Sequence, residues 1–116
     1  MTPAQFRKLA LSMPEAVEGA HHGHADFRRD GRVFASLHPD GERAMVKVPL
    51  DEQQRLCAAR GDAFSPATGA WGRAGCTMVV LAEVAIAEVR DAMSLAWQES
   101  AAQRAKVRPR RRPRAT

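Results

Sequence analysis

The sequence predicts an α+β fold, a two-layer sandwich in which a five-stranded antiparallel sheet carries helices on one face. Apolar residues recur at helical spacing near both ends of the folded part, and alternating patterns separated by tight turns lie between them. The expected order of elements is α-β-β-β-α-β-β-α, which is typical of this class. A chain of 116 residues, 45% of them hydrophobic, has room for one such domain.

The first helix is expected to begin after Thr2. Thr2 and Gln5 have the spacing of a capping box, and Pro3 suits the first helical position. Pro14 should end the helix, because its ring cannot continue the helical hydrogen bonding. The buried stripe of this helix is predicted to consist of Phe6, Leu9, Ala10 and Met13.

Three strands should follow a turn-rich segment at residues 15–24. Asp30-Gly31 predicts a type I′ hairpin turn, in which both central residues need positive φ. The strands are expected at Ala25–Arg29, Arg32–His38 and Glu42–Val48. Alternation places Val33, Ala35, Leu37, Ala44, Val46 and Val48 on one face, and Arg32, Phe34, Ser36, His38, Arg43, Met45 and Lys47 on the other.

A second helix should begin near Asp51 and turn two residues, Leu56 and Cys57, toward the core. A short strand is predicted near Thr68–Trp71, in a Gly-rich segment with no room for a helix, and Cys76–Leu81 is expected to be the fifth strand.

The last helix should span about Glu83–Ser100. Its apolar stripe is predicted to consist of Val89, Ala92, Met93, Ala96 and Trp97. Because Trp97 and Phe6 each lie on the inward stripe of a helix, we expect them to pack together beneath the sheet.

The positive charge of the chain is concentrated at its C-terminal end. Residues 102–116 hold seven cations and no acid, which are Arg104, Lys106, Arg108, Arg110, Arg111, Arg112 and Arg114. Residues 1–101 hold 11 Lys and Arg against 13 Asp and Glu, a net charge near −2. Pro109 and Pro113 among these arginines argue against a helix. We therefore predict a domain at 1–101 and a disordered basic tail at 102–116.

The cellular location is predicted from what the sequence does not contain. The N-terminal residues lack the apolar stretch of a signal peptide, and the longest apolar run, Met78–Ala82, is far too short to span a bilayer. Cys57 and Cys76 form no CxxC pair and are expected to be free thiols in the core. A cytoplasmic protein is expected.

Several short segments, in order along the chain, resemble the MmcQ/YjbR family of small bacterial proteins over roughly residues 3–98. They are Gly23-His24-Ala25-Asp26-Phe27-Arg28, Gly31-Arg32-Val33-Phe34-Ala35-Ser36-Leu37, Val46-Lys47-Val48-Pro49, Glu52-Gln53-Gln54, Phe64-Ser65-Pro66, Gly69-Ala70-Trp71-Gly72-Arg73 and Gly75-Cys76-Thr77. The resemblance implies an α+β fold comparable with frataxin (CyaY) and secretion chaperones. It also implies DNA binding, and it brings no catalytic residues.

Cations on the sheet suggest a nucleic-acid site. The candidates in the domain are Arg28, Arg32, Arg43, Lys47 and Arg73, in addition to the seven cations of the basic tail. With Phe34 and Met45 beside them, they could hold phosphates while a ring stacks on a base. The alternative is that these are the ordinary outward residues of a sheet with one buried face.

Two Gly-containing segments suggest a second site. His24, Asp26, Lys47, Trp71 and Arg73 could converge there on a small anionic ligand, with Trp71 as the stacking face. The alternative is that Trp71 is a large side chain that pins a long loop onto the core.

No metal, cofactor or catalytic site is predicted. His21, His22 and His24 could begin a zinc site, but the cysteines lie far away in sequence, and a half-buried histidine needs the same partners. No serine lies in a nucleophile elbow, and no Gly-rich phosphate loop precedes a helix.

The sequence therefore predicts a non-enzymatic domain that binds nucleic acid weakly and without sequence preference, largely through the basic tail. The alternative is a module that binds a small molecule or a protein between the His21–Asp26 and Trp71–Arg73 loops.

Overall fold

The computed structural model describes the backbone of residues 1–21 and 23–111, and the side chains of residues 1–20 and 23–101. The elements, in chain order, are α1 (Pro3–Leu11), β1 (Val17–His21), β2 (His24–Arg29), β3 (Arg32–Leu37), β4 (Arg43–Lys47), α2 (Leu50–Ala59), β5 (Phe64–Pro66), α3 (Gly69–Arg73), β6 (Cys76–Val80), a 3-10 turn (Leu81–Glu83) and α4 (Ile86–Arg111).

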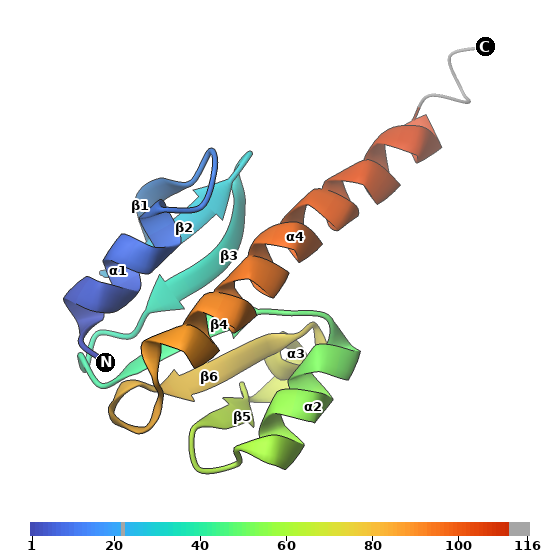
Figure 1. Cartoon of the computed structure of the whole chain (residues 1–116). Coiled ribbons are helices and arrows are strands. Elements are labelled where there is room, and N and C mark those ends of the chain that lie inside the picture. Colours follow the sequence, from blue (N-terminus) through green and yellow to red (C-terminus); the bar gives the residue numbers. More distant parts are fainter. Residues whose placement is uncertain (22, 112–116) are drawn as a thin grey trace.

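The strands form one antiparallel sheet with the order β1-β2-β3-β4-β6-β5. The helices α1, α2 and α4 cover one face, and the short helix α3 lies behind β6 (Figure 1). The predicted α+β class is confirmed, although the sheet has six strands instead of five.

Two parts of the strand prediction were wrong. Residues 17–21 form the edge strand β1, because backbone pairing with β2 does not need an alternating apolar pattern. The strand expected near Thr68–Trp71 is instead helix α3, and the strand in that part of the chain is the preceding segment, β5.

The first helix agrees with its prediction. The Thr2 hydroxyl accepts from the Gln5 amide at 3.1 Å and the Gln5 side chain accepts from the Thr2 amide at 2.9 Å, which completes the capping box. Phe6 and Ala10 are fully buried. The Phe6 ring contacts the Phe27 ring of β2 with 6.2 Å between centroids, an inclined aromatic pair at the centre of the core.

A β-bulge changes the predicted faces of β3. Phe27 pairs with Ala35, but Arg28 pairs with Val33, so one residue of β3 is left over between them. That residue, Phe34, is fully buried in the core beside Ala35. The prediction that Phe34 faces outward and Val33 inward was therefore wrong, because strict alternation holds only without a bulge.

The last helix buries the predicted stripe except at its end. Val89, Ala92, Met93 and Ala96 are at most 1% exposed, but Trp97 lies at the border of the core. The Trp97 indole donates to the Pro14 carbonyl at 2.8 Å, and the Arg29 guanidinium lies 3.8 Å from the ring centroid. Among the described side chains the rings of Trp97 and Phe6 form no aromatic pair, and the Phe6 ring packs on Phe27 instead.

Helix α4 continues well beyond the predicted end at Ser100. It reaches Arg111 and projects past the sheet (Figure 1). The expectation that Pro109 prevents a helix was wrong as far as Arg111. A proline inside a helix removes one backbone donor and crowds the carbonyl four residues earlier, which can kink a helix without ending it. Residues 112–116 lie outside the described residues, and the division at residue 101 stays a prediction. In the part of the chain that the structure describes, no helix is long and apolar enough to cross a membrane.

Candidate functional site

The face of the sheet opposite the long helices has one row of side chains running across it. Cross-strand pairing aligns Asp26 with Ser36, Ser36 with Met45, and Met45 with Met78. Residues paired in this way point to the same side of a sheet. The row therefore passes from a charged end on β2 to an apolar centre on β4 and β6.

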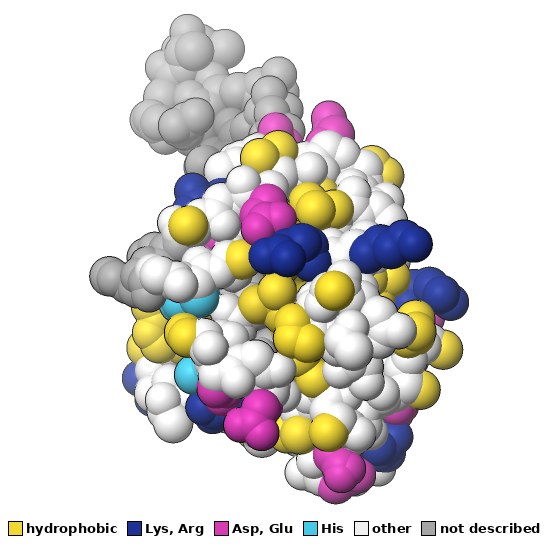
Figure 2. Space-filling view, turned by 90° about the vertical axis from the view of Figure 1, so that its left-hand side faces the viewer, with side chains coloured by type: hydrophobic (Ala, Val, Ile, Leu, Met, Phe, Trp, Pro, Cys, Tyr) yellow, Lys and Arg dark blue, Asp and Glu magenta, His cyan; other side chains and the backbone are white. Residues whose placement is uncertain are grey.

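This row is the floor of an open groove of about 640 Å³, which we call the open-face groove. It is lined by His24, Asp26, Val33, Ser36, His38, Ala44, Met45, Ala67, Thr68, Trp71, Cys76 and Met78. Figure 2 shows the molecule from the left-hand side of Figure 1, where α1 and β1 lie, with hydrophobic side chains between charged ones and histidine side chains near its left edge. The volume lies within the range of small-molecule sites, about 300–1,000 Å³.

The wall of the groove on the β6 side is Trp71, which is 71% exposed. The alternative that Trp71 pins a loop into the core is therefore wrong. A large exposed aromatic ring beside an apolar floor offers a stacking surface.

Buried contacts fix the short helix that carries Trp71. Gly72 packs so closely that a Cβ atom there would lie 1.9 Å from the Ala67 carbonyl oxygen. The buried Gln53 side chain, from α2, donates to the carbonyl of Gly72 at 3.0 Å and to that of Cys76 at 3.0 Å. The ring is thus exposed although its backbone is held, which is the arrangement of a preformed binding surface.

The charged end of the groove is held by an ion pair. Asp26 is 2% exposed, and both its oxygens accept from Arg28, at 2.8 and 3.0 Å. These contacts and the Asp26 charge raise the pKa of Arg28. Gly19 on β1 leaves room for the pair, because a Cβ atom there would lie 2.9 Å from an Asp26 oxygen. Arg28 is therefore engaged by Asp26.

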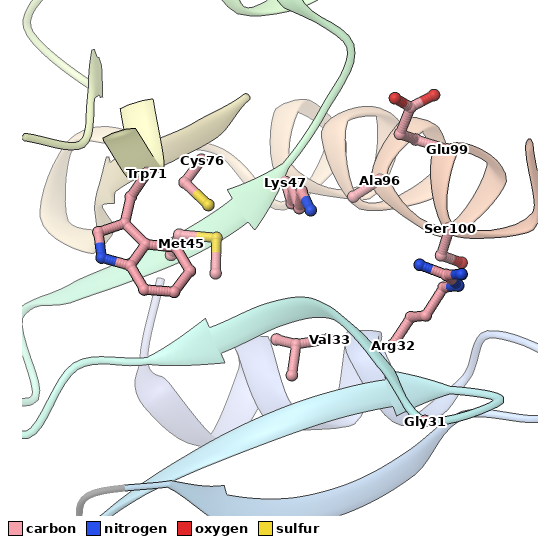
Figure 3. Close-up of a pocket in the computed structure, with 10 residues that line it drawn as sticks. All are labelled: Gly31, Arg32, Val33, Met45, Lys47, Trp71, Cys76, Ala96, Glu99 and Ser100. Carbon is pink, nitrogen blue, oxygen red and sulfur yellow. The ribbon is translucent and has the colours of Figure 1, made fainter. Parts of the chain in front are cut away.

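A second cavity of about 310 Å³ adjoins the groove, and we call it the slot. It is lined by Gly31, Arg32, Val33, Met45, Lys47, Trp71, Cys76, Ala96, Glu99 and Ser100. The pairing of β3 with β4 runs from Leu37↔Ala44 to Ala35↔Val46, and beyond it the two strands separate. The slot lies at this separation, with Trp71, Met45 and Cys76 on one side and Arg32 and Ser100 on the other (Figure 3).

The predicted basic face is divided by the structure. Arg28 pairs with Asp26, and Arg43 pairs with Asp40 at 2.9 Å. Arg73 is exposed on α3 and is not among the residues that line the groove or the slot. Arg32 and Lys47 both line the slot, and neither forms an ion pair with a side chain that the structure describes.

Asp40 also fixes the turn beside His38. The backbone amide of Glu42 donates to its carboxylate at 2.8 Å, which is the main cause that lowers the pKa of Asp40 to about 2, with Arg43 and His38 adding to it. The contribution of this group to stability is thus complete above about pH 4 and is lost as the pH falls through 2. We expect the Asp40 carboxyl carbon to titrate by NMR with a midpoint near 2. A midpoint near 3.8 would contradict the turn geometry.

The thiols and histidines form no metal site in the described residues. Cys57 and Cys76 are free, as predicted, and burial raises the pKa of both thiols. Within the described part of the chain, no three His, Cys, Asp or Glu side chains could together hold a metal ion. The side chains of His21 and His22 lie outside the described residues.

The predicted loop site is brought together in part. His24, Asp26 and Trp71 line the groove, and Lys47 shares the slot with Trp71, but Arg73 belongs to neither cavity. The sequence reasoning missed the methionine floor, in particular Met78. Its signal was the alternation of Cys76–Val80, in which Met78 falls opposite the buried Thr77 and Val79.

Comparisons with known proteins agree with this architecture. A family model described as YjbR matches residues 11–99. The fold is similar to the crystal structure of Deinococcus radiodurans protein DR2400, which has a DUF419 domain, with a TM-score of 0.67, 16% sequence identity, and coverage of 78% of this chain and 72% of that chain. None of the curated proteins compared with the chain matches it. Because the family model covers most of the domain, the chain belongs to the YjbR family.

Proposed function

We propose that the protein is a non-enzymatic, cytoplasmic domain that binds nucleic acid, with most of the affinity supplied by the basic tail. The observation that carries the proposal is the path of α4. Ser100 of this helix lines the slot together with Arg32 and Lys47, and the cations of the tail begin at Arg104, about one helical turn later. The backbone of α4 therefore leads from the slot directly into the segment that carries the tail cations.

The charge distribution supports the same proposal. Residues 1–101 have a net charge near −2 from 11 cations and 13 acids, so the domain alone offers little general attraction to phosphates. The tail adds seven cations in 15 residues. Cations at this density neutralise phosphates and release counterions, which gives affinity without sequence preference.

The test is a salt titration of duplex DNA binding by the full-length chain and by a variant in which all seven tail cations are changed to Gln. If all seven meet phosphates, the slope of log K against log salt should be about −6 for the unchanged chain and close to zero for the variant. A control variant, Lys8→Gln with Arg90→Gln, removes exposed cations elsewhere and should keep the steep slope. A tail variant that binds as tightly as the unchanged chain at low salt would overturn the proposal.

A second candidate function is that of a small-molecule binding module, favoured by the size of the open-face groove and its methionine floor. Its signature differs from that of the tail. Binding of an uncharged aromatic probe such as indole should be saturable, independent of salt, and unchanged in the seven-Gln variant. Failure of Trp71→Ala to weaken such binding would exclude the groove as its site.

A further inference from the structure

We propose that the open-face groove and the slot together form a site for one unpaired nucleotide of a single strand, with its base stacked on Trp71 and its phosphate held by Lys47 and Arg32. This inference rests on the proposed nucleic-acid function and adds a preference of the domain for single strands over duplex.

The base would lie where the two cavities meet. The two cavities share four lining residues, which are Val33, Met45, Trp71 and Cys76. One ligand can therefore extend from the groove into the slot. The indole is 71% exposed on a backbone fixed by Gln53, so little order has to be gained on binding. A flat base stacked on this ring would remove apolar surface of both the base and the indole from water.

The rim of the groove can satisfy the polar edge of a base. Ser36 and Thr68 line it, and each of their hydroxyl groups can donate and accept a hydrogen bond. These hydroxyls lie beside the methionines of the floor, which is the composition of a site that orients a flat, partly polar ligand. They also explain why the occupant should be more polar than a hydrocarbon ring.

The phosphate would lie in the slot. Lys47 from β4 and Arg32 from β3 extend into it from the two strands that separate there, while Figure 3 shows the Glu99 carboxylate pointing away from both. These two cations form no ion pair with a described side chain, and they lie next to an exposed aromatic ring. A nucleotide has the same arrangement of partners, since its phosphate is separated from its base only by the sugar.

A duplex cannot use this site, because its bases are stacked on each other and their faces cannot reach Trp71. The domain should therefore distinguish single strands from duplex, whereas the basic tail, which meets only phosphates, should not.

The test uses the full-length protein and one oligonucleotide sequence as a single strand and as a duplex. Trp71→Ala should weaken single-strand binding about 5- to 150-fold and leave duplex binding unchanged. Lys47→Gln should weaken single-strand binding and reduce its salt slope by about 0.7. Leu50→Ala, which removes another exposed apolar side chain, is the matched control and should change neither.

A direct readout comes from fluorescence. In a Trp97→Phe background Trp71 is the remaining tryptophan, and the single strand should quench its emission. Equal losses on single strand and duplex in Trp71→Ala, or quenching by adenosine monophosphate without quenching by the oligonucleotide, would overturn the single-strand site. Duplex binding that survives in the seven-Gln variant would instead overturn the tail function, so the two failures are distinguishable.

Discussion

Phe27→Ala should destabilise the protein by about 3–5 kcal/mol, a large share of the roughly 5–15 kcal/mol that holds a small domain together. Phe27 is completely buried and its ring packs against Phe6 of α1, which is completely buried as well. Removing the ring leaves a cavity between the sheet and α1 that neighbouring side chains fill only in part. Urea unfolding, with the midpoint and slope compared between variant and unchanged chain, measures the loss.

The matched control is another aromatic substitution, Trp71→Ala. Because Trp71 is 71% exposed, its removal should change the free energy of unfolding by less than about 0.5 kcal/mol. A loss as large as that of Phe27→Ala would show that the Trp71 ring is part of the core. It would also remove the exposed stacking surface on which the proposed nucleotide site depends.

Gly75→Ala should cost about 2–5 kcal/mol, from backbone strain and from a forced close contact together. Gly75 has φ +106°, and a Cβ atom there would lie 2.1 Å from the Val48 carbonyl oxygen. The Val48 amide donates to the Gly75 carbonyl at 3.1 Å, so the two backbones are fixed beside each other. The contact lies just after the last residue of β4 and just before the first residue of β6, next to the slot.

Gly31→Ala separates the two causes. Gly31 also has a positive φ, +79°, but a Cβ atom there would meet nothing within 4 Å. This variant should lose only about 1 kcal/mol, the cost of an unfavourable backbone region. If thermal unfolding shows the same loss of unfolding free energy for Gly75→Ala and Gly31→Ala, the close contact with Val48 does not contribute to the destabilisation.

The candidate site could be predicted from the sequence only in part. His24, Asp26, Lys47 and Trp71 were identified as polar or amphipathic groups that the apolar pattern does not need, and the structure places each of them at the groove or the slot. Arg28 and Arg43 were assigned to a basic face, but each is engaged by an acid a few residues away. Whether a cation is engaged or available depends on side-chain geometry, which charge counts do not contain.

Local interactions made several features predictable. The capping box of Thr2 depends on residues within one helical turn. The hairpin at Asp30-Gly31 depends on two residues that tolerate positive φ, +52° and +79°. The division of charge between domain and tail is a property of composition alone. In each case the free energy that selects the structure arises among neighbours in sequence.

Tertiary structure decided the rest. Phe34 turns into the core because the register between β2 and β3 shifts by one residue, and this shift depends on both strands. Trp71 is exposed because Gly72 packs against Ala67 and Gln53 holds the Gly72 carbonyl from another helix. The sequence thus determined the fold class, the cap of α1, the turn at Asp30-Gly31, and where the charge lies. The bulge, the exposed ring and the slot were decided only by contacts between segments that are distant in the chain. The free energy of such contacts cannot be predicted from a local sequence pattern.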